Sequence, residues 1–277
     1  MNKLITELQR LYFLDSQRWS GEGALTAEIV ATGVAGERSV AFDLVGADGQ
    51  VRALVVEFEK AADWQHAARL YQAVQDELGW PAPALSISGH QGYAIWLSLA
   101  DALPVAQAAA FLAALRNSYL ADLPANRLGL RPAVDTIARV TLTPGRHPAS
   151  GSWAAFIDPS LGGMFIDEPW LEMAPNQDKQ ADLLAAIKSI SAAEFEQALS
   201  VLQSSPQTGT APIVTEPAPS GDVLARRRAT LNVGDDYRDP QTFLLAVMND
   251  TSACARHRIA AAKALLPCFP SGVAGKP

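Results

Sequence analysis

Two glutamates stand two residues apart at the end of an apolar run. In the segment VVEFEKAAD, Glu57 and Glu59 fall on one side of an extended chain and Val56 and Phe58 on the other, because side chains alternate along a strand. Hard divalent cations such as Mg²⁺ take oxygen ligands, usually one or two carboxylates completed by water and substrate phosphates. The spacing therefore favours a metal site, although the solvated outer face of a strand carries the same pattern.

A loop bounded by glycines follows farther along the chain. Residues 84–104, ALSISGHQGYAIWLSLADALP, alternate like two strands joined by GHQG. Gly89 and Gly92 permit positive φ and remove Cβ atoms that would keep a phosphate from backbone N–H groups, and Ser88 and His90 add side-chain donors. These four residues predict a binding site for a triphosphate. The alternative is an ordinary four-residue hairpin turn.

A third segment combines an acid with cationic residues. In RPAVDTIARVTLTPGRHPASGSWAAFID, Asp135 ends an apolar stretch, as a further metal ligand would. Arg139, Arg146 and His147 follow as possible phosphate donors, since the planar guanidinium donates two parallel hydrogen bonds. Alternatively, Asp135 caps a turn or a helix, and Arg146 and His147 belong to a solvated loop.

The surrounding periodicities predict helices and strands in a mixed order. Helices are expected at 5–14, at 61–79 with Gly79 as the stop, after Pro104, at 178–190 and at 191–203, where Ser191 and Glu194 form a capping box. Strands are expected at 25–33, 39–45, 51–59, in the hairpin, near 131–143 and at 152–157. This order predicts an α+β domain with a mostly antiparallel sheet covered by helices on one face.

Composition indicates one large globular domain with a short appendage. The chain has 277 residues, of which 49% are apolar and 18% charged. Residues 204–221 are rich in Pro, Ser and Thr, so we expect a domain at 1–203, a linker at 204–221 and a small helical tail at 222–277. The tail carries eight Lys and Arg against five Asp, a net charge of +3, and its apolar pattern predicts two amphipathic helices. It could dock on a protein partner, on the domain or on a phosphate backbone.

Other features exclude several classes of protein. No apolar run reaches the roughly 18–20 residues that span a bilayer, and the first residues lack the pattern of a signal peptide, so no membrane association and a cytoplasmic location are expected. Cys254 and Cys268 lack metal-finger spacing. The net charge of −7 argues against a protein that coats nucleic acid without specificity.

Taken in order, these segments resemble the archaeo-eukaryotic primase superfamily, which includes primase–polymerases. That family has a D-x-D pair on a strand, a hairpin with S-G-x-x-G-x-H, and a later strand with a third acid. The segments VVEFEKAAD, SISGHQGYA and VDTIARVTLTPGRH are similar to these in order and spacing. The resemblance covers roughly residues 50–200 and implies a primase–polymerase-like fold with an RRM-like core.

The resemblance also implies an activity. Glu57, Glu59 and Asp135 would be the catalytic acids that hold Mg²⁺ or Mn²⁺, and Ser88 and Gly89 would meet the nucleotide's phosphates. The implied function is a nucleotidyltransferase of the DNA primase and polymerase type. It would use nucleoside triphosphates on a DNA or RNA template, in the replication of a mobile element or plasmid.

Two departures from the family pattern support a second hypothesis. The acidic pair is Glu-Phe-Glu, whose side chains are each one methylene longer than aspartate, and Ala94 stands where the family has histidine. Metal-assisted transfer requires ligands placed to within fractions of an ångström. The chain is therefore alternatively a degenerate nucleotide- or nucleic-acid-binding module that has kept the fold.

Overall fold

A curled antiparallel sheet carries the candidate residues. The computed structural model describes residues 3–20, 23–133 and 139–204, and within these ranges six strands form one sheet in the order β5-β2-β4-β3-β8-β7, with every neighbouring pair antiparallel. The strands of this sheet are β2 (Gln50–Phe58), β3 (Ala84–Ile87), β4 (Tyr93–Pro104), β5 (Leu128–Arg131), β7 (Gly145–Arg146) and β8 (Trp153–Ile157). A separate two-stranded ladder pairs β1 (Ala41–Asp43) with β6 (Arg139–Thr141). The predicted α+β class with a mostly antiparallel sheet is confirmed.

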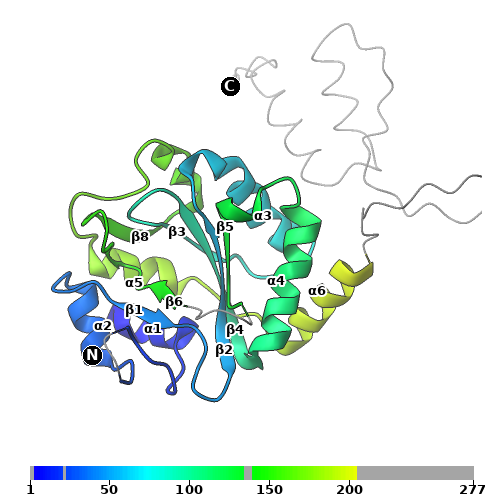
Figure 1. Ribbon diagram of the computed structural model, residues 1–277, viewed down its shortest axis with the longest axis horizontal. Helices are drawn as coiled ribbons and strands as arrows, with labels where there is room; N and C mark the ends of the chain where they lie inside the picture. Colours follow the sequence, from blue (N-terminus) through cyan, green and yellow to red (C-terminus); the bar gives the residue numbers. More distant parts are fainter. Residues whose placement is uncertain (1–2, 21–22, 134–138, 205–277) are drawn as a thin grey trace, which may run out of the picture. The chain divides into compact units, whose positions relative to one another are not determined.

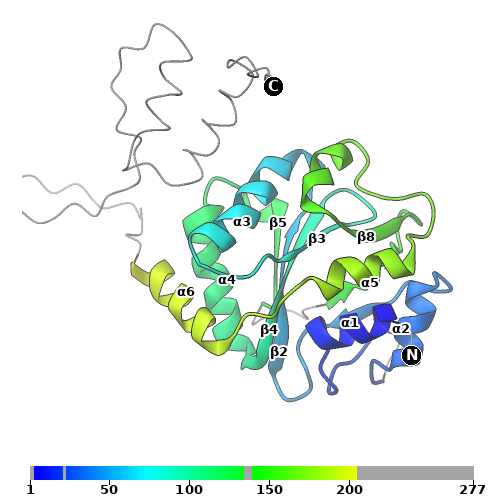
Figure 2. The ribbon, with the colours of Figure 1, turned by 180° about the vertical axis from the view of Figure 1, so that it is seen from behind.

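Helices lie on both sides of this sheet rather than on one. Figures 1 and 2 show α3, α4 and α6 on one side and α1, α2 and α5 on the other. Their bounds are α1 (Lys3–Tyr12), α2 (Ala27–Val34), α3 (Trp64–Asp76), α4 (Val105–Tyr119), α5 (Gln177–Ala185) and α6 (Ala192–Ser204). Three short 3₁₀ turns complete the helical content of the described ranges: η1 (Ala61–Asp63), η2 (Ala125–Arg127) and η3 (Pro159–Phe165). The expectation of helices on one face is therefore wrong.

Strand β2 explains why both faces are covered. Its residues 53–56, ALVV, are apolar at every position and all buried, as in a strand that is covered on both sides. Val56 and Phe58 belong to the core under α3, α4 and α6, whereas Ala53 and Val55 belong to the core under α1, α2 and α5. An alternating pattern would have left one face polar.

The segment 25–33, predicted as a strand, forms helix α2. The Thr26 side chain caps the helix by accepting the Ile29 N–H at 3.3 Å, and Glu28 stands in the first turn, where a negative charge is favourable. Val30 and Val34, four residues apart, are both buried. The short apolar pattern fitted both periodicities, and the cap decides for the helix.

Most other predicted elements are confirmed. Helix α6 begins with the expected capping box, in which Ser191 and Glu194 exchange backbone-to-side-chain hydrogen bonds of 2.7 and 3.3 Å. Gly79 adopts φ +69° after α3. The strand expected near 131–143 is instead two short strands in different sheets, β5 and β6.

The tail and the linker after Ser204 lie outside the described residues, as does Asp135, so these predictions stand as made. Across the ranges that the structure describes, no helix combines the length and the apolarity needed to cross a bilayer.

A buried ion pair fixes the segment that follows β2. The Asp63 side chain is only 2% exposed and accepts hydrogen bonds from both Nε, at 3.0 Å, and Nη2 of Arg127. The Glu59 N–H also donates to the Arg127 carbonyl at 3.0 Å. The turn that carries Glu59 is thereby tied to the start of β5.

We expect Asp63→Ala to lower the free energy of unfolding by about 2 kcal/mol, because it leaves Arg127 without its partner. This loss is smaller than the ~3–5 kcal/mol expected when a fully buried ion pair is broken, since Arg127 is partly exposed. Asp43→Ala is the matched control. It breaks a partly exposed pair with Arg139 and should cost less than about 1 kcal/mol. Urea unfolding measures both, and equal losses would contradict this ranking.

Candidate active site

Strand β4 brings the acidic pair and the glycine-bounded loop to the same end of the sheet. It lies between β2 and β3 and pairs antiparallel with both, so the carboxyl ends of β2 and β3 lie at the same end of the sheet, on either side of β4. The register sets Glu57 opposite Ala94, and Ala94 opposite Ser86, in one row across the sheet. Glu59 and Ser88 follow two residues later on their segments and therefore face the same side.

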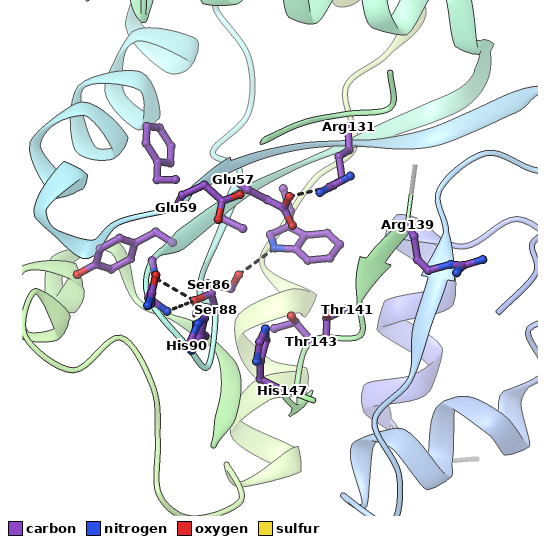
Figure 3. A pocket seen from close by; sticks show the side chains of 16 residues that line it. Glu57, Glu59, Ser86, Ser88, His90, Arg131, Arg139, Thr141, Thr143 and His147 are labelled. Atoms are coloured by element: carbon purple, nitrogen blue, oxygen red, sulfur yellow. Dashed lines mark hydrogen bonds and ion pairs between the residues drawn. The ribbon is translucent and has the colours of Figure 1, made fainter. Parts of the chain in front are cut away.

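A pocket of about 240 Å³ opens over this row (Figure 3). Its polar walls come from the ends of β2 and β3 and the segments that follow them, from β4, β5 and β6, and from the segments before and after β7. The residues with polar side chains that line it are Glu57, Glu59, Ser86, Ser88, His90, Gln91, Tyr93, Trp96, Arg131, Arg139, Thr141, Thr143 and His147, with Gly92 and Ala94 between them. The pocket thus unites most of the predicted site residues. Gly89 and Arg146 do not line it.

Glu57 is the partly buried carboxylate of the pocket. Arg131 donates from Nε to its Oε2 at 2.6 Å. Burial raises the pKa of Glu57 and the nearby charge of Glu59 acts in the same direction, while Arg131 opposes both. Gly129 stands opposite Glu57 on β5, where a Cβ would lie 2.6 Å from Oε2. Glycine therefore leaves the space that this carboxylate fills.

The loop after β3 is held together by the hydroxyl of Ser88. Ser88 Oγ accepts the N–H groups of His90, Gln91 and Gly92 at 3.2, 3.1 and 2.9 Å. The Gly89 N–H donates to the Pro169 carbonyl at 3.1 Å. These N–H groups already have acceptors, which differs from the open cradle that the sequence predicts. A serine hydroxyl has one hydrogen of its own, so Ser88 can still donate to a ligand.

The two loop glycines are required for different structural reasons. Gly89 adopts φ +75°, and a Cβ there would lie 2.7 Å from the Ala154 nitrogen. Gly92 has no positive φ; a Cβ there would lie 1.7 Å from the Phe58 carbonyl oxygen. Gly92 is thus required by the close approach of the loop to β2, and not by its own backbone conformation.

Two histidines from separate loops stack at the pocket. The rings of His90 and His147 lie 4.9 Å apart between centroids, at an interplanar angle of 10°. His147 Nδ1 accepts the Ala149 N–H at 3.3 Å, which assigns the proton of the neutral ring to Nε2. Burial, and to a smaller degree the neighbouring His90, lowers the pKa of His147. His147 is therefore a neutral N–H donor at pH 7.

The two remaining arginine candidates are engaged elsewhere. Arg139 lines the pocket but donates to Asp43 at 3.2 Å, and Figure 3 shows it extending away from the glutamates. Arg146 donates to the Gly151 carbonyl at 3.0 Å.

Sequence reasoning missed several lining residues. Ser86, on β3, precedes Ser88 by two residues, and this spacing was the available signal. Arg131, Thr141 and Thr143 depend on the pairing of β5 and on the path of the chain after β6, for which the sequence gives no spacing rule.

Glu57 and Glu59 fit a cation that arrives with phosphates. Mg²⁺ in such sites takes one or two protein carboxylates and completes its shell with water and ligand oxygens. Among the residues that the structure describes, no three His, Cys, Asp or Glu side chains gather into a metal-binding group. A cation held by this pair would therefore need ligand oxygens, or the contribution of Asp135.

Comparison with known proteins gives a distant structural likeness. No protein family and no curated protein matches the chain. The AEP domain of the primase-polymerase of cyanophage S-2L is similar over 66% of this chain and 96% of its own, at 15% identity and a TM-score of 0.38. We infer the function from the pocket itself.

Gly92→Ala should lower the free energy of unfolding by about 2 kcal/mol or more, because the new methyl overlaps the Phe58 carbonyl and the backbone must move. Gly163→Ala is the control. Its nearest contact would be Trp64 Nε1 at 3.6 Å, so a change within about 0.5 kcal/mol is expected. Denaturant unfolding tests the pair, and a Gly92→Ala protein as stable as the control would contradict the described approach of loop and strand.

The lowered pKa of His147 predicts a pH-dependent stability. Below its ordinary value of 6.5, the unfolded state binds the proton more readily than the folded state, so His147 lowers the stability as the pH falls through 6.5. His147→Asn should remove this contribution to the pH dependence of the stability. The stability advantage of the wild type over the variant should shrink between about pH 7.5 and about pH 5.5. A difference that is constant across this range in thermal melts would show that His147 is not held neutral.

Proposed function

We propose that this domain is a primase–polymerase-like nucleotidyltransferase that binds a nucleoside triphosphate and a divalent cation in the pocket of Figure 3. One observation carries the proposal. The paired carboxylates at the end of β2 and the hydroxyl and imidazole donors of the loop after β3 line the same pocket. Acids for a cation and neutral donors for phosphate oxygens are the two halves of a site for a metal-bound triphosphate.

The pocket residues have roles that their surroundings support. Glu57 and Glu59 would hold Mg²⁺ or Mn²⁺, with Asp135 as a further ligand. The bound cation supplies charge neutralisation on the phosphates and a lower pKa for the attacking hydroxyl. Ser88 Oγ–H and His147 Nε2–H would donate to phosphate oxygens, because both groups line the pocket with a hydrogen to give.

The reaction that suits this site is the extension or synthesis of a primer on a DNA or RNA template. A 3′-hydroxyl would attack the α-phosphorus of the triphosphate, with pyrophosphate as the leaving group. Replication of a mobile element or plasmid is the setting that the family resemblance implies.

A second function is favoured by two observations inside the pocket. Ala94 stands between Glu57 and Ser86 in the row across the sheet and offers no hydrogen-bond donor. Arg131 occupies an oxygen of Glu57. A module that binds nucleotides or nucleic acid without turnover would tolerate both.

Incorporation of a labelled nucleotide on primed and unprimed templates, with Mg²⁺ or Mn²⁺, tests the proposal. Glu57→Gln and Glu59→Gln should each lower incorporation by about 100-fold or more, because a carboxylate ligand is lost without a change of shape. Glu196→Gln, an exposed change on α6 on the other side of the sheet, should leave it unchanged. Triphosphate binding without incorporation would favour the second function, and no binding at all would contradict both.

A further inference from the structure

Arg131 lies within reach of Glu57 because of the sheet register. It stands on β5, the four-residue edge strand, where it pairs with Val55 of β2. Glu57 follows Val55 by two residues, so the two charged side chains are diagonal neighbours on one face. The separation of 2.6 Å between Arg131 Nε and Glu57 Oε2 is that of a strong charge-assisted hydrogen bond.

The contact confines one oxygen of a predicted metal ligand. Oε2 of Glu57 accepts from Arg131, and it is also the atom that a Cβ at position 129 would approach most closely. Both charged side chains are about 30% exposed, at 31% for Arg131 and 27% for Glu57. Across the described ranges Glu59, in contrast, forms no ion pair. The two carboxylates of the acidic pair are therefore unequal before any cation is bound.

A guanidinium and a divalent cation compete for such an oxygen. Both are positive, and within ångströms of each other in a partly buried pocket their repulsion is not screened as it is in bulk water. A cation on Oε2 therefore requires Arg131 to move. Its partly exposed position on an edge strand allows this movement without breaking the core.

We propose that Arg131 is the resident counter-cation of Glu57 and that a divalent cation binds this carboxylate in exchange for the guanidinium. Arg131 thereby sets the metal affinity of the pocket. This inference rests on the proposed function, since it takes Glu57 as a metal ligand. Arg131 acts through Glu57 and is a positioning residue.

Titration of the full chain with Mn²⁺ alone, followed by the electron paramagnetic resonance signal of free Mn²⁺, tests the exchange. Arg131→Met keeps the apolar stem and removes the charge, and it should lower the Kd by about fivefold, the upper range for a partly exposed pair. Arg131→Lys keeps the charge and should stay closer to the wild type. Arg139→Met is the matched control, because it removes the same charge from the same pocket, but from a side chain paired with Asp43, and it should change the Kd less than about twofold.

The outcomes separate this inference from the proposed function. Tighter binding by Arg131→Met that is abolished by a second change, Glu57→Gln, supports the exchange. If the wild type and Arg131→Met bind Mn²⁺ equally and both lose it with Glu57→Gln, the metal site stands and the exchange is overturned. If neither the wild type nor Arg131→Met binds Mn²⁺, with or without a non-hydrolysable nucleoside triphosphate, both are overturned. If Arg131→Met and Arg139→Met raise the affinity for Mn²⁺ equally, the effect comes from the net charge of the pocket, and the exchange is overturned.

A measurement on the wild type keeps the inference testable if Arg131→Met fails to fold. The Nε–H of Arg131 is held by Glu57, so its nuclear magnetic resonance signal should exchange slowly with water. Saturating Mg²⁺ should make this exchange faster, and should leave the Nε–H of Arg127 on buried Asp63 unchanged. An Arg131 signal that Mg²⁺ does not affect would contradict the exchange.

Discussion

The double pairing of β4 is the constraint on which the candidate site depends. Because β4 is antiparallel to both β2 and β3, these two strands end at the same end of the sheet. Glu57, Ala94 and Ser86 then form one row across the three strands. A slip of one residue in either ladder would turn the acids or the serines to the other face. The apolar residues that alternate with them are buried in the core under α3, α4 and α6, so the same burial that stabilises the sheet fixes the direction of the polar groups.

Several polar groups of the pocket are already paired within the protein itself. Glu57 is paired with Arg131, and Arg139 with Asp43, while Ser88 gathers three N–H groups of its own loop. Each of these contacts lowers the cost of burying a polar group. A ligand that binds Glu57 must therefore replace the contact with Arg131, and its affinity will depend on the difference between the old and the new partner.

Local periodicity predicted what depends on neighbours in the sequence. Alternation placed Glu57 and Glu59 together, the capping box placed α6, and the glycines marked the loop that brings Ser88 and His90 to the pocket. Contacts between distant segments were not predictable. The ion pair of Arg131 depends on the register of an edge strand, and Gly92 is required by a carbonyl in another strand. The short segment 25–33 fitted both periodicities, and burial on both faces of β2 removed the polar side that would have been expected.

The central claim is that one pocket holds both the cation and the phosphates. A crystal soaked with Mn²⁺ and a non-hydrolysable nucleoside triphosphate, measured at the manganese absorption edge, tests it most directly. We expect an anomalous peak beside the carboxylates of Glu57 and Glu59, with phosphate density between that peak and the loop that carries Ser88 and His90. A triphosphate bound elsewhere on the protein, or a pocket that stays empty under saturating ligand, would contradict it.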